Sequence, residues 1–352
     1  MRRRTVAKRW KQRPENSTWG DWGEDDELGR INLLTPEKVL QGIREVQTGQ
    51  TFSLSLPLDY PGGTSLNQRR YPPILKPTED LQYNQDTFFN VVARDAIDPS
   101  LIDVWGDDQV TLWLQYSTQW DALAHQGALF DADGDGEAEP VYYNGFRPGD
   151  HIIGPQEDAK GDGSGSVSFN KHLGLEHMAE HGVQGRGVLI DVRRHLGDDW
   201  QPVNLATLKD IMAADNVVVE PGDMLLIHTG FATQILEWER NPDPEKIQAM
   251  HAYLDASDDD LLQWIIDSQI SALVADNYAV EGWAPQSAEP HTLLPIHNLC
   301  LFRLGVPLGE LWYLNDLAKW LHENGRSRFL LTAPPLNLPG VMGCPLTPIA
   351  TV

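Results

Sequence analysis

The side chains best suited to chemistry in this chain are gathered in one short segment, Gln115 to His125. Gln115, Ser117, Gln119 and Asp121 alternate with other residues, so they share one face if a strand continues through them. A row of oxygen-bearing side chains that faces a core costs free energy unless it binds something. The spacing predicts a polar face near a histidine, which is either a binding site or a hydrogen-bonded strand end.

Alternating strand and helix patterns must position this segment. A strand is expected over Gln109 to Tyr116, which leads directly into the polar row. A helix should begin at Thr35, as its cap, with Pro36 in the first turn, and run to about Val46. The other predicted strands are Thr51 to Leu58, Gly187 to Val192, Met224 to His228 and Leu273 to Ala275. The other predicted helices are Leu205 to Ala214, Pro244 to Leu254, Asp259 to Ser268, and Leu314 to Asn324, closed by Gly325.

This alternation predicts a mixed α/β domain with a substantial antiparallel part. No internal repeat divides the chain, so we expect residues 21–352 to form one domain. Residues 1–20 are expected to form a basic N-terminal arm. The arm begins with the basic stretch Met1 to Arg13, which is either solvated or laid across an acidic partner subunit.

Composition narrows the functional classes. The 352 residues carry a net charge of −24, which argues against nucleic acid and anionic lipid as partners. Cys300 and Cys344 do not make a disulfide framework, and no stretch approaches the length of a membrane helix. The basic start is followed by Pro14, Glu15 and Asn16 rather than by an apolar export signal. We therefore expect a cytoplasmic protein that acts on a small molecule.

Other chemistry-bearing residues carry weaker signals. The run Asp131 to Gly136 matches the first half of a calcium loop, but the twelfth position is Tyr142 instead of Glu, which favours a polar surface loop. Tyr143 and Asn144 follow closely and could line a substrate pocket, although ordinary packing explains such residues equally well. Three further histidines are expected to be structural: His177, His181 and His291. Of these, His181 and His291 are the better candidates for another role.

The segment around Asp121 resembles the signature of the cyclase family of metal-dependent hydrolases, which includes kynurenine formamidases and isatin hydrolases. That signature reads His-x-Gly-Thr-His-x-Asp-x-Pro-x-His. Thr118, Asp121 and His125 match it in register. Gln115 and Gln119 stand where the two leading histidines would be. Two smaller departures are Ser117 in place of Gly and Leu123 in place of Pro.

Several further stretches are similar to the larger members of this family, in the same order along the chain. They are Trp22 to Pro36, His181 to Asp191, Pro221 to Gly230, and His297 to Leu311. The resemblance implies a swivelling β/β/α fold and a homo-oligomer, either a dimer or a tetramer.

The resemblance also implies a metal site with one or two divalent ions, Zn²⁺ or Mn²⁺, in each subunit. Its ligands by position are Gln115, Gln119, Asp121, His297 and Glu310. An amide oxygen is a weaker zinc ligand than imidazole, so the two glutamines should weaken the first metal position. A second position made by Asp121, His297 and Glu310 could survive alone, with three protein ligands and an open place for water.

The activity that the resemblance implies is hydrolysis of an amide or lactone, often cyclic in this family. His125 would be the general acid/base, and Asp121 would orient and charge the metal site. The candidate substrate-binding residues are Trp113, Trp120, Tyr143 and Asn144. Two alternatives stay open: a binding protein of the same fold that has lost its metal, and a cyclase or dehydratase that runs the reverse reaction.

Overall fold

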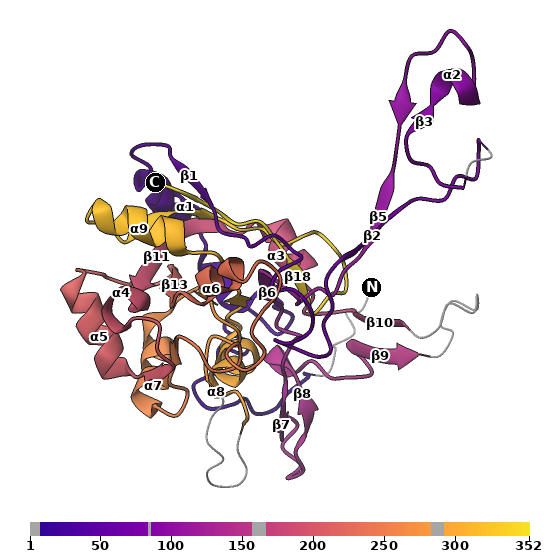
Figure 1. The fold of residues 1–352 in the computed structure, drawn as a ribbon. Coiled ribbons are helices and arrows are strands. Elements are labelled where there is room, and N and C mark those ends of the chain that lie inside the picture. The colour runs from indigo at the N-terminus through magenta and orange to yellow at the C-terminus, as the bar shows by residue number, and fades with distance from the viewer. Residues whose placement is uncertain (1–7, 84–85, 157–166, 283–291) are drawn as a thin grey trace.

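The computed structural model describes residues 8–83, 86–156, 167–282 and 292–352, and within them the main element is a nine-stranded mixed sheet (Figure 1). The strands run in the order β1-β19-β17-β11-β13-β15-β16-β6-β18. Their bounds are β1 Thr51–Ser53, β6 Gln119–Asp121, β11 Gln184–Asp191, β13 Met224–His228, β15 Ala272–Ala275, β16 Leu308–Glu310, β17 Arg328–Thr332, β18 Gly343–Pro345 and β19 Ile349–Thr351. The strands β11, β13, β15 and β16 are parallel, and antiparallel strands flank them on both sides. The mixed α/β prediction is confirmed.

Helices cover both faces of this sheet, so its central strands are apolar on both sides. One face packs against α4 Val192–Leu196, α5 Leu205–Ala214 and α7 Asp259–Ser268. The other packs against α3 Glu176–His181 and α9 Asn315–Glu323. Helix α1, Pro36–Arg44, crosses β11 so closely that a Cβ at Gly42 would lie 2.7 Å from the carbonyl oxygen of Gly185. Only a glycine fits at that crossing.

Shorter elements complete the described chain. The helices are η1 Gly29–Leu33, α2 Ala93–Ala96, η2 Tyr143–Gly145, α6 Phe231–Glu237, α8 Pro295–His297 and η3 Asn298–Leu304. The strands, all in two-stranded sheets, are β2 Ile74–Pro77, β3 Val91–Val92, β4 Val104–Trp105, β5 Asp108–Thr111, β7 Ala128–Phe130, β8 Glu139–Val141, β9 Ile152–Gln156, β10 Val167–Asn170, β12 Gln201–Val203 and β14 Ala252–Leu254. None of the helices within the described ranges is both long and apolar enough to cross a membrane.

Most of the predicted elements are present. Helix α1 begins where expected, because the Thr35 side chain accepts a hydrogen bond from the Lys38 amide. Helices α5 and α7 span the predicted residues, α9 is one residue shorter at each end, and the three buried strands became β11, β13 and β15. The strand predicted from Thr51 is shorter than expected and ends at Ser53.

Two predicted elements were wrong. The segment expected to be a helix from Pro244 to Leu254 ends instead in β14, which pairs in parallel with β12. The strand expected over Gln109 to Tyr116 stops at Thr111, because β5 pairs only with β2. A turn follows, and β6 begins anew at Gln119. The four-residue polar row is therefore not one continuous strand face.

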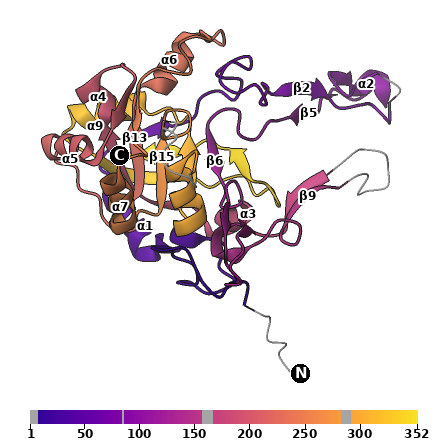
Figure 2. The ribbon, with the colours of Figure 1, turned by 90° about the horizontal axis from the view of Figure 1, so that it is seen from below.

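Residues 74–83 and 86–111 form an arm that projects from the body in both ribbon views (Figures 1 and 2). It contains the paired strands β2 and β5, the paired strands β3 and β4, and the short helix α2. Every residue of β2 and β5 is exposed. The arm leaves the body just after Arg70 and returns to it just before Gln115.

The N-terminal segment lies on the body of its own chain from Lys8 onward, while residues 1–7 of the predicted arm lie outside the described residues. Trp10 and Trp19 are buried, and Trp19 packs edge-on against Phe302. Arg9 and Arg13 form ion pairs with Asp25 and Asp21 at 2.8 and 2.7 Å.

Glu27 fastens this N-terminal extension to the region around α3. Its carboxylate accepts a hydrogen bond from the Leu173 amide at 2.6 Å and lies 2.7 Å from His172 and 2.9 Å from His177. Burial alone would raise the pKa of Glu27, but the contacts with His177, His172 and the Leu173 amide outweigh it and lower the pKa to about 2. The contact with Glu27 correspondingly raises the pKa of His177.

This pair predicts a pH-dependent loss of stability in Glu27→Gln. Because folding lowers the pKa of Glu27, its ionised carboxylate stabilises the folded state at pH values above the ordinary pKa of 4.5. This stabilisation is lost as the pH falls toward 2. Because folding raises the pKa of His177, its protonated ring stabilises the folded state at pH values below the ordinary pKa of 6.5. This contribution is lost as the pH rises through the raised pKa. Urea unfolding at pH 5–6 should show a loss of about 1–2 kcal/mol, which allows for partial solvent screening.

The loss in Glu27→Gln should shrink on acidification toward pH 3. Glu24→Gln is the matched control, because Glu24 is half exposed and makes only a 3.5 Å contact with Lys8. A destabilisation of Glu27→Gln that does not change with pH would contradict this account.

Candidate metal centre

The pairing of β6 with β16 brings together residues that are far apart in the chain. Gln119 lies directly opposite Glu310, although 191 positions separate them. Asp121 lies on the same face of β6 as Gln119, opposite Leu308 on one side and Gly343 on the other. All these side chains face the core that contains α5 and α7.

His297 joins this face from the end of α8, and Glu281 orients it. One oxygen of Glu281 lies 2.8 Å from the Nδ1 of His297 and accepts the His297 amide, while the other accepts the Ile296 amide. With Nδ1 engaged in this way, the Nε2 of His297 points at Glu310, at 3.2 Å from its Oε1. A carboxylate that fixes the far nitrogen of a histidine in this manner is typical of metal-binding imidazoles.

Asp121, His297 and Glu310 form a compact buried group whose ligand atoms all lie within 4.8 Å of one another. Two buried oxygens at this point, Oδ2 of Asp121 and Oε1 of Gln119, accept no hydrogen bond from the described residues. Buried polar atoms are normally satisfied, so these two unpartnered oxygens fit a centre that binds a cation. Two carboxylates and one imidazole fit a divalent ion such as Zn²⁺ or Mn²⁺.

The protonation of these groups depends on their neighbours. Burial alone would lower the pKa of His297, but its contacts with Glu281 and Glu310 raise it to about 10. Burial raises the pKa of Asp121, and the nearby Glu310 carboxylate adds to the effect. Glu310 has the opposite shift, because its contact with His297 outweighs burial and lowers its pKa. The positive charge of His297 is thus shared between the carboxylates of Glu281 and Glu310.

The two glutamines predicted as ligands occupy different places. The Nε2 of Gln119 donates to Asp121 at 3.3 Å and to Glu310 at 3.1 Å, so its amide bridges both carboxylates. Gln115 lies on the turn before β6, and its side chain lies over Gly343, where a Cβ would come within 2.7 Å of its Nε2. Gln119 is therefore in the centre, and a ligand role for Gln115 stays a prediction.

His125 lies on the turn that follows β6. Its Nδ1 is 4.0 Å from an oxygen of Asp121, and a quarter of its side chain is exposed while that of Asp121 is fully buried. His125 can therefore contact both the buried centre and a molecule that enters from solvent.

Three of the four predicted substrate-binding residues have structural roles. Trp120 points to the opposite face of β6, where its Nε1 donates to Ala333 and its ring packs on Trp312. Trp120 therefore lies on the face away from Asp121, because neighbouring strand residues face opposite ways, and its role as a pocket wall stays a prediction. The Tyr143 hydroxyl contacts Thr18 and Asp26.

The Asn144 amide nitrogen donates to the carbonyl oxygens of Gly23, Glu24 and Asp26. Tyr143 and Asn144 thus hold the N-terminal segment, and their role in substrate binding stays a prediction. Trp113 is half-buried at the base of the arm and packs against Tyr71, so its role in binding stays a prediction.

The structure adds three residues that were not predicted from the sequence: Glu281, Arg70 and Tyr278. Glu281 orients His297, as described above. The charge of Arg70 is near enough to lower the pKa of both Asp121 and Glu310, and Tyr278 lies beside Glu310 and Arg70. None of the three belongs to a recognisable motif, so only tertiary proximity reveals them.

The remaining histidines and the acidic loop lie elsewhere. His177 pairs with Glu27, His181 is exposed on α3, and His291 lies outside the described residues. In the loop, Asp131, Asp133 and Glu139 have ligand atoms within 4.8 Å of one another, but Glu139 also pairs with Arg147 at 2.6 Å.

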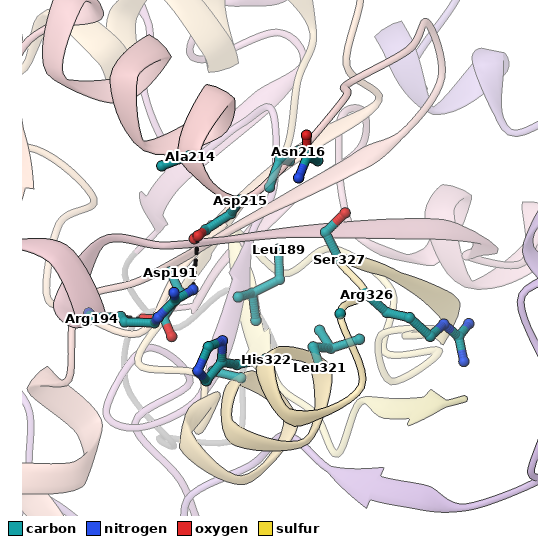
Figure 3. A pocket seen from close by; sticks show the side chains of 13 residues that line it. Leu189, Asp191, Arg194, Ala214, Asp215, Asn216, Leu321, His322, Arg326 and Ser327 are labelled. Carbon is teal, nitrogen blue, oxygen red and sulfur yellow. Dashed lines mark hydrogen bonds and ion pairs between the residues drawn. The ribbon is translucent and has the colours of Figure 1, made fainter.

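A separate polar cavity lies between the ends of α5 and α9 (Figure 3). Its lining contains Asp191, Arg194, Asp215 and His322, but none of the predicted site residues. Arg194 and Asp215 bind each other there at 2.7 Å, and Asp191 is engaged with His228. The charges of this cavity are thus largely paired within the protein.

The fold and the buried carboxylate–imidazole group define an α/β protein with a centre suited to a divalent metal. Comparison with protein families gives a match over residues 52–282 to the Cyclase family, described as "Putative cyclase". The chain belongs to this cyclase family. A comparison with curated protein sequences gave no match.

Solved structures agree with this assignment. A crystal structure described as a novel cyclase is 32% identical, with a TM-score of 0.72, and the alignment covers 96% of this chain and 97% of the other. Isatin hydrolase A from Labrenzia aggregata, bound to benzyl benzoate, shares 13% identity and a TM-score of 0.53 over 86% of this chain and 93% of its own. Isatin hydrolase A from Ralstonia solanacearum gives 14% and 0.51 over 86% and 91%. The two isatin hydrolases share the fold.

Asp121→Asn should weaken the binding of Mn²⁺ by roughly 100-fold or more, because it removes a charged ligand from a site with few ligands. Isothermal titration of protein stripped of metal measures this directly. Asp131→Asn is the control for the acidic loop and should leave the Mn²⁺ affinity unchanged. Equal affinities of Asp121→Asn and the unmodified protein would place the metal elsewhere.

Gln119→His should raise the affinity for Zn²⁺ relative to Mn²⁺ by at least about tenfold, since imidazole is a better zinc ligand than an amide. Competition titrations with the two ions in parallel give the ratio. If the ratio stays the same, position 119 does not contact the ion.

Proposed function

We propose that this protein is a metal-dependent hydrolase that opens an amide or lactone carbonyl. The observation that carries the proposal is the compact buried group of Asp121, His297 and Glu310, which lies beside the partly accessible His125. Membership of the cyclase family and the shared fold with isatin hydrolases support it.

A divalent ion bound by this group would polarise a substrate carbonyl and lower the pKa of water. The protein's own residues would bind the ion and move the protons. Glu281 holds the ring of His297 so that its Nε2 faces the centre. Asp121 and Glu310 supply negative charge, and the Gln119 amide keeps their oxygens in place.

His125 is the group placed to transfer protons. It is the titratable side chain next to Asp121 that solvent can still reach. During hydrolysis it would take a proton from the attacking water and then give one to the leaving nitrogen or oxygen. The same groups would serve ring closure in the reverse direction, so assays should start from both the cyclic and the open compound.

A second candidate function is ligand binding without metal, and one observation favours it. The Nε2 of Gln119 already lies between Asp121 and Glu310 and donates to both carboxylates. The amide thus partly replaces the attraction that a cation would supply. Elemental analysis of protein purified without added metal separates the two functions. No stoichiometric metal, and no hydrolysis of a panel of lactones and amides after addition of Mn²⁺ or Zn²⁺, would favour binding.

His125→Ala should leave the fold intact and lower turnover by about 100-fold or more, because proton transfer by a positioned side chain contributes a factor of that size. Steady-state kinetics with Mn²⁺ present, together with thermal unfolding, test both parts. His181→Ala is the matched control, since that histidine is exposed on α3. Near-normal turnover in His125→Ala would rule out this role.

A further inference from the structure

Arg70 is a half-buried arginine at the base of the arm. It lies near the carboxylate centre, because it binds Gln115, whose side chain lies against Gly343, the residue of β18 that is paired with Asp121. One of its terminal nitrogens donates to the backbone oxygen of Gln115 at 2.5 Å, and its guanidinium lies 5.8 Å from the ring centre of Tyr278. A guanidinium has five donor hydrogens, so most of its hydrogen-bonding capacity is left after this bond.

Within the described ranges, Arg70 has no carboxylate at ion-pair distance. The contrast with Arg186 is instructive, because that buried arginine is bound by Asp223 at 2.8 Å and also by Glu220. Arg240, on the surface, is likewise bound by Asp59. A partly buried arginine without such a partner is placed to bind an anion from outside the protein.

Arg70 lines a small pocket to which residues next to the centre also contribute. Its lining contains Gln115, which precedes β6, and Leu311, which follows Glu310. Asn67, Leu66, Tyr116 and Tyr278 complete the polar and apolar walls, and Arg70 is the charged member of the described lining. Burial and the charge of Glu310 raise the pKa of Tyr278, so its hydroxyl stays neutral at ordinary pH.

The charges around the centre make the position of Arg70 significant. Asp121 and Glu310 would balance a divalent ion, but Glu281 adds another negative charge behind His297. Without Arg70 this part of the protein, in a chain with a net charge of −24, would repel an anionic substrate. Arg70 offsets that charge on the side of the pocket, where a substrate would lie.

We propose that the substrate carries a carboxylate, and that Arg70 binds this group while the scissile carbonyl lies at the Asp121–Glu310 centre. The proposal rests on the proposed hydrolase function and names its substrate class: an amide or lactone with an anionic group beside the reacting bond. Arg70 acts in binding and orientation, so its removal should raise KM far more than it lowers kcat.

The kinetic test uses γ-valerolactone and the analogue in which a carboxylate replaces its methyl group, each with Mn²⁺-loaded enzyme. The unmodified enzyme should prefer the carboxylate compound. Arg70→Gln should raise the KM for that compound by roughly 10- to 100-fold, since a hydrogen-bonded charge pair contributes a factor of that order. The KM for the neutral lactone should change far less. Arg70→Lys should restore part of the loss, because it keeps the charge without the fork of donors.

Arg69→Gln is the matched control, because Arg69 is the exposed neighbour of Arg70. It should leave both substrates unaffected. Equal losses on the two lactones in Arg70→Gln, or no preference in the unmodified enzyme, would overturn the proposal.

A binding measurement separates failure of this proposal from failure of the proposed function. Calorimetry with phenylacetate and its alcohol counterpart, phenylethanol, needs no turnover. Arg70→Gln should remove the preference for phenylacetate while the variant still binds Mn²⁺. If phenylacetate binds Arg70→Gln as tightly as the unmodified protein but is lost with Asp121→Asn, the carboxylate binds the metal, and the role of Arg70 is refuted.

Discussion

The buried carboxylates of Asp121 and Glu310 must share one small volume, and the surrounding residues compensate for their repulsion. His297 contributes the main compensating charge, and the Gln119 amide donates to both carboxylates. Glu281 then fixes the imidazole from behind. Each group depends on the next, so removal of any one leaves a buried charge without a partner, at a cost of several kcal/mol. This mutual dependence also explains why the β6–β16 pairing must be kept in register.

Local signals in the sequence were sufficient for much of the fold. The Thr35 cap, the amphipathic pattern of α5 and α7, and the apolar runs of β11, β13 and β15 are properties of contiguous residues. The tertiary context decided the rest. Residues 252–254 pair with β12 although their neighbours suggest a helix, and β5 departs into the arm although its alternation suggests that it continues.

The residues of the site likewise fall into those that the sequence marked and those that only the fold brings together. The family signature marked Asp121 and His125, and a later stretch marked His297 and Glu310, so these residues could be singled out before their contacts were known. The direction of a side chain depends on where a strand restarts. The break before Gln119 placed Trp120 on the far face, in the core with Trp312. Glu281 and Arg70 belong to no motif, and their contacts with the centre arise only through folding.

The arm enters and leaves the body between two pocket residues, Arg70 and Gln115, while the carboxylates sit on strands of the central sheet. Its length and sequence can therefore change through insertion or deletion without any shift in the register of β6 and β16. Such changes would move Arg70 relative to a fixed reactive centre. The fold thus separates what must be conserved for chemistry from what can drift toward new substrates, and descendants of one ancestor can diverge in specificity through this segment alone.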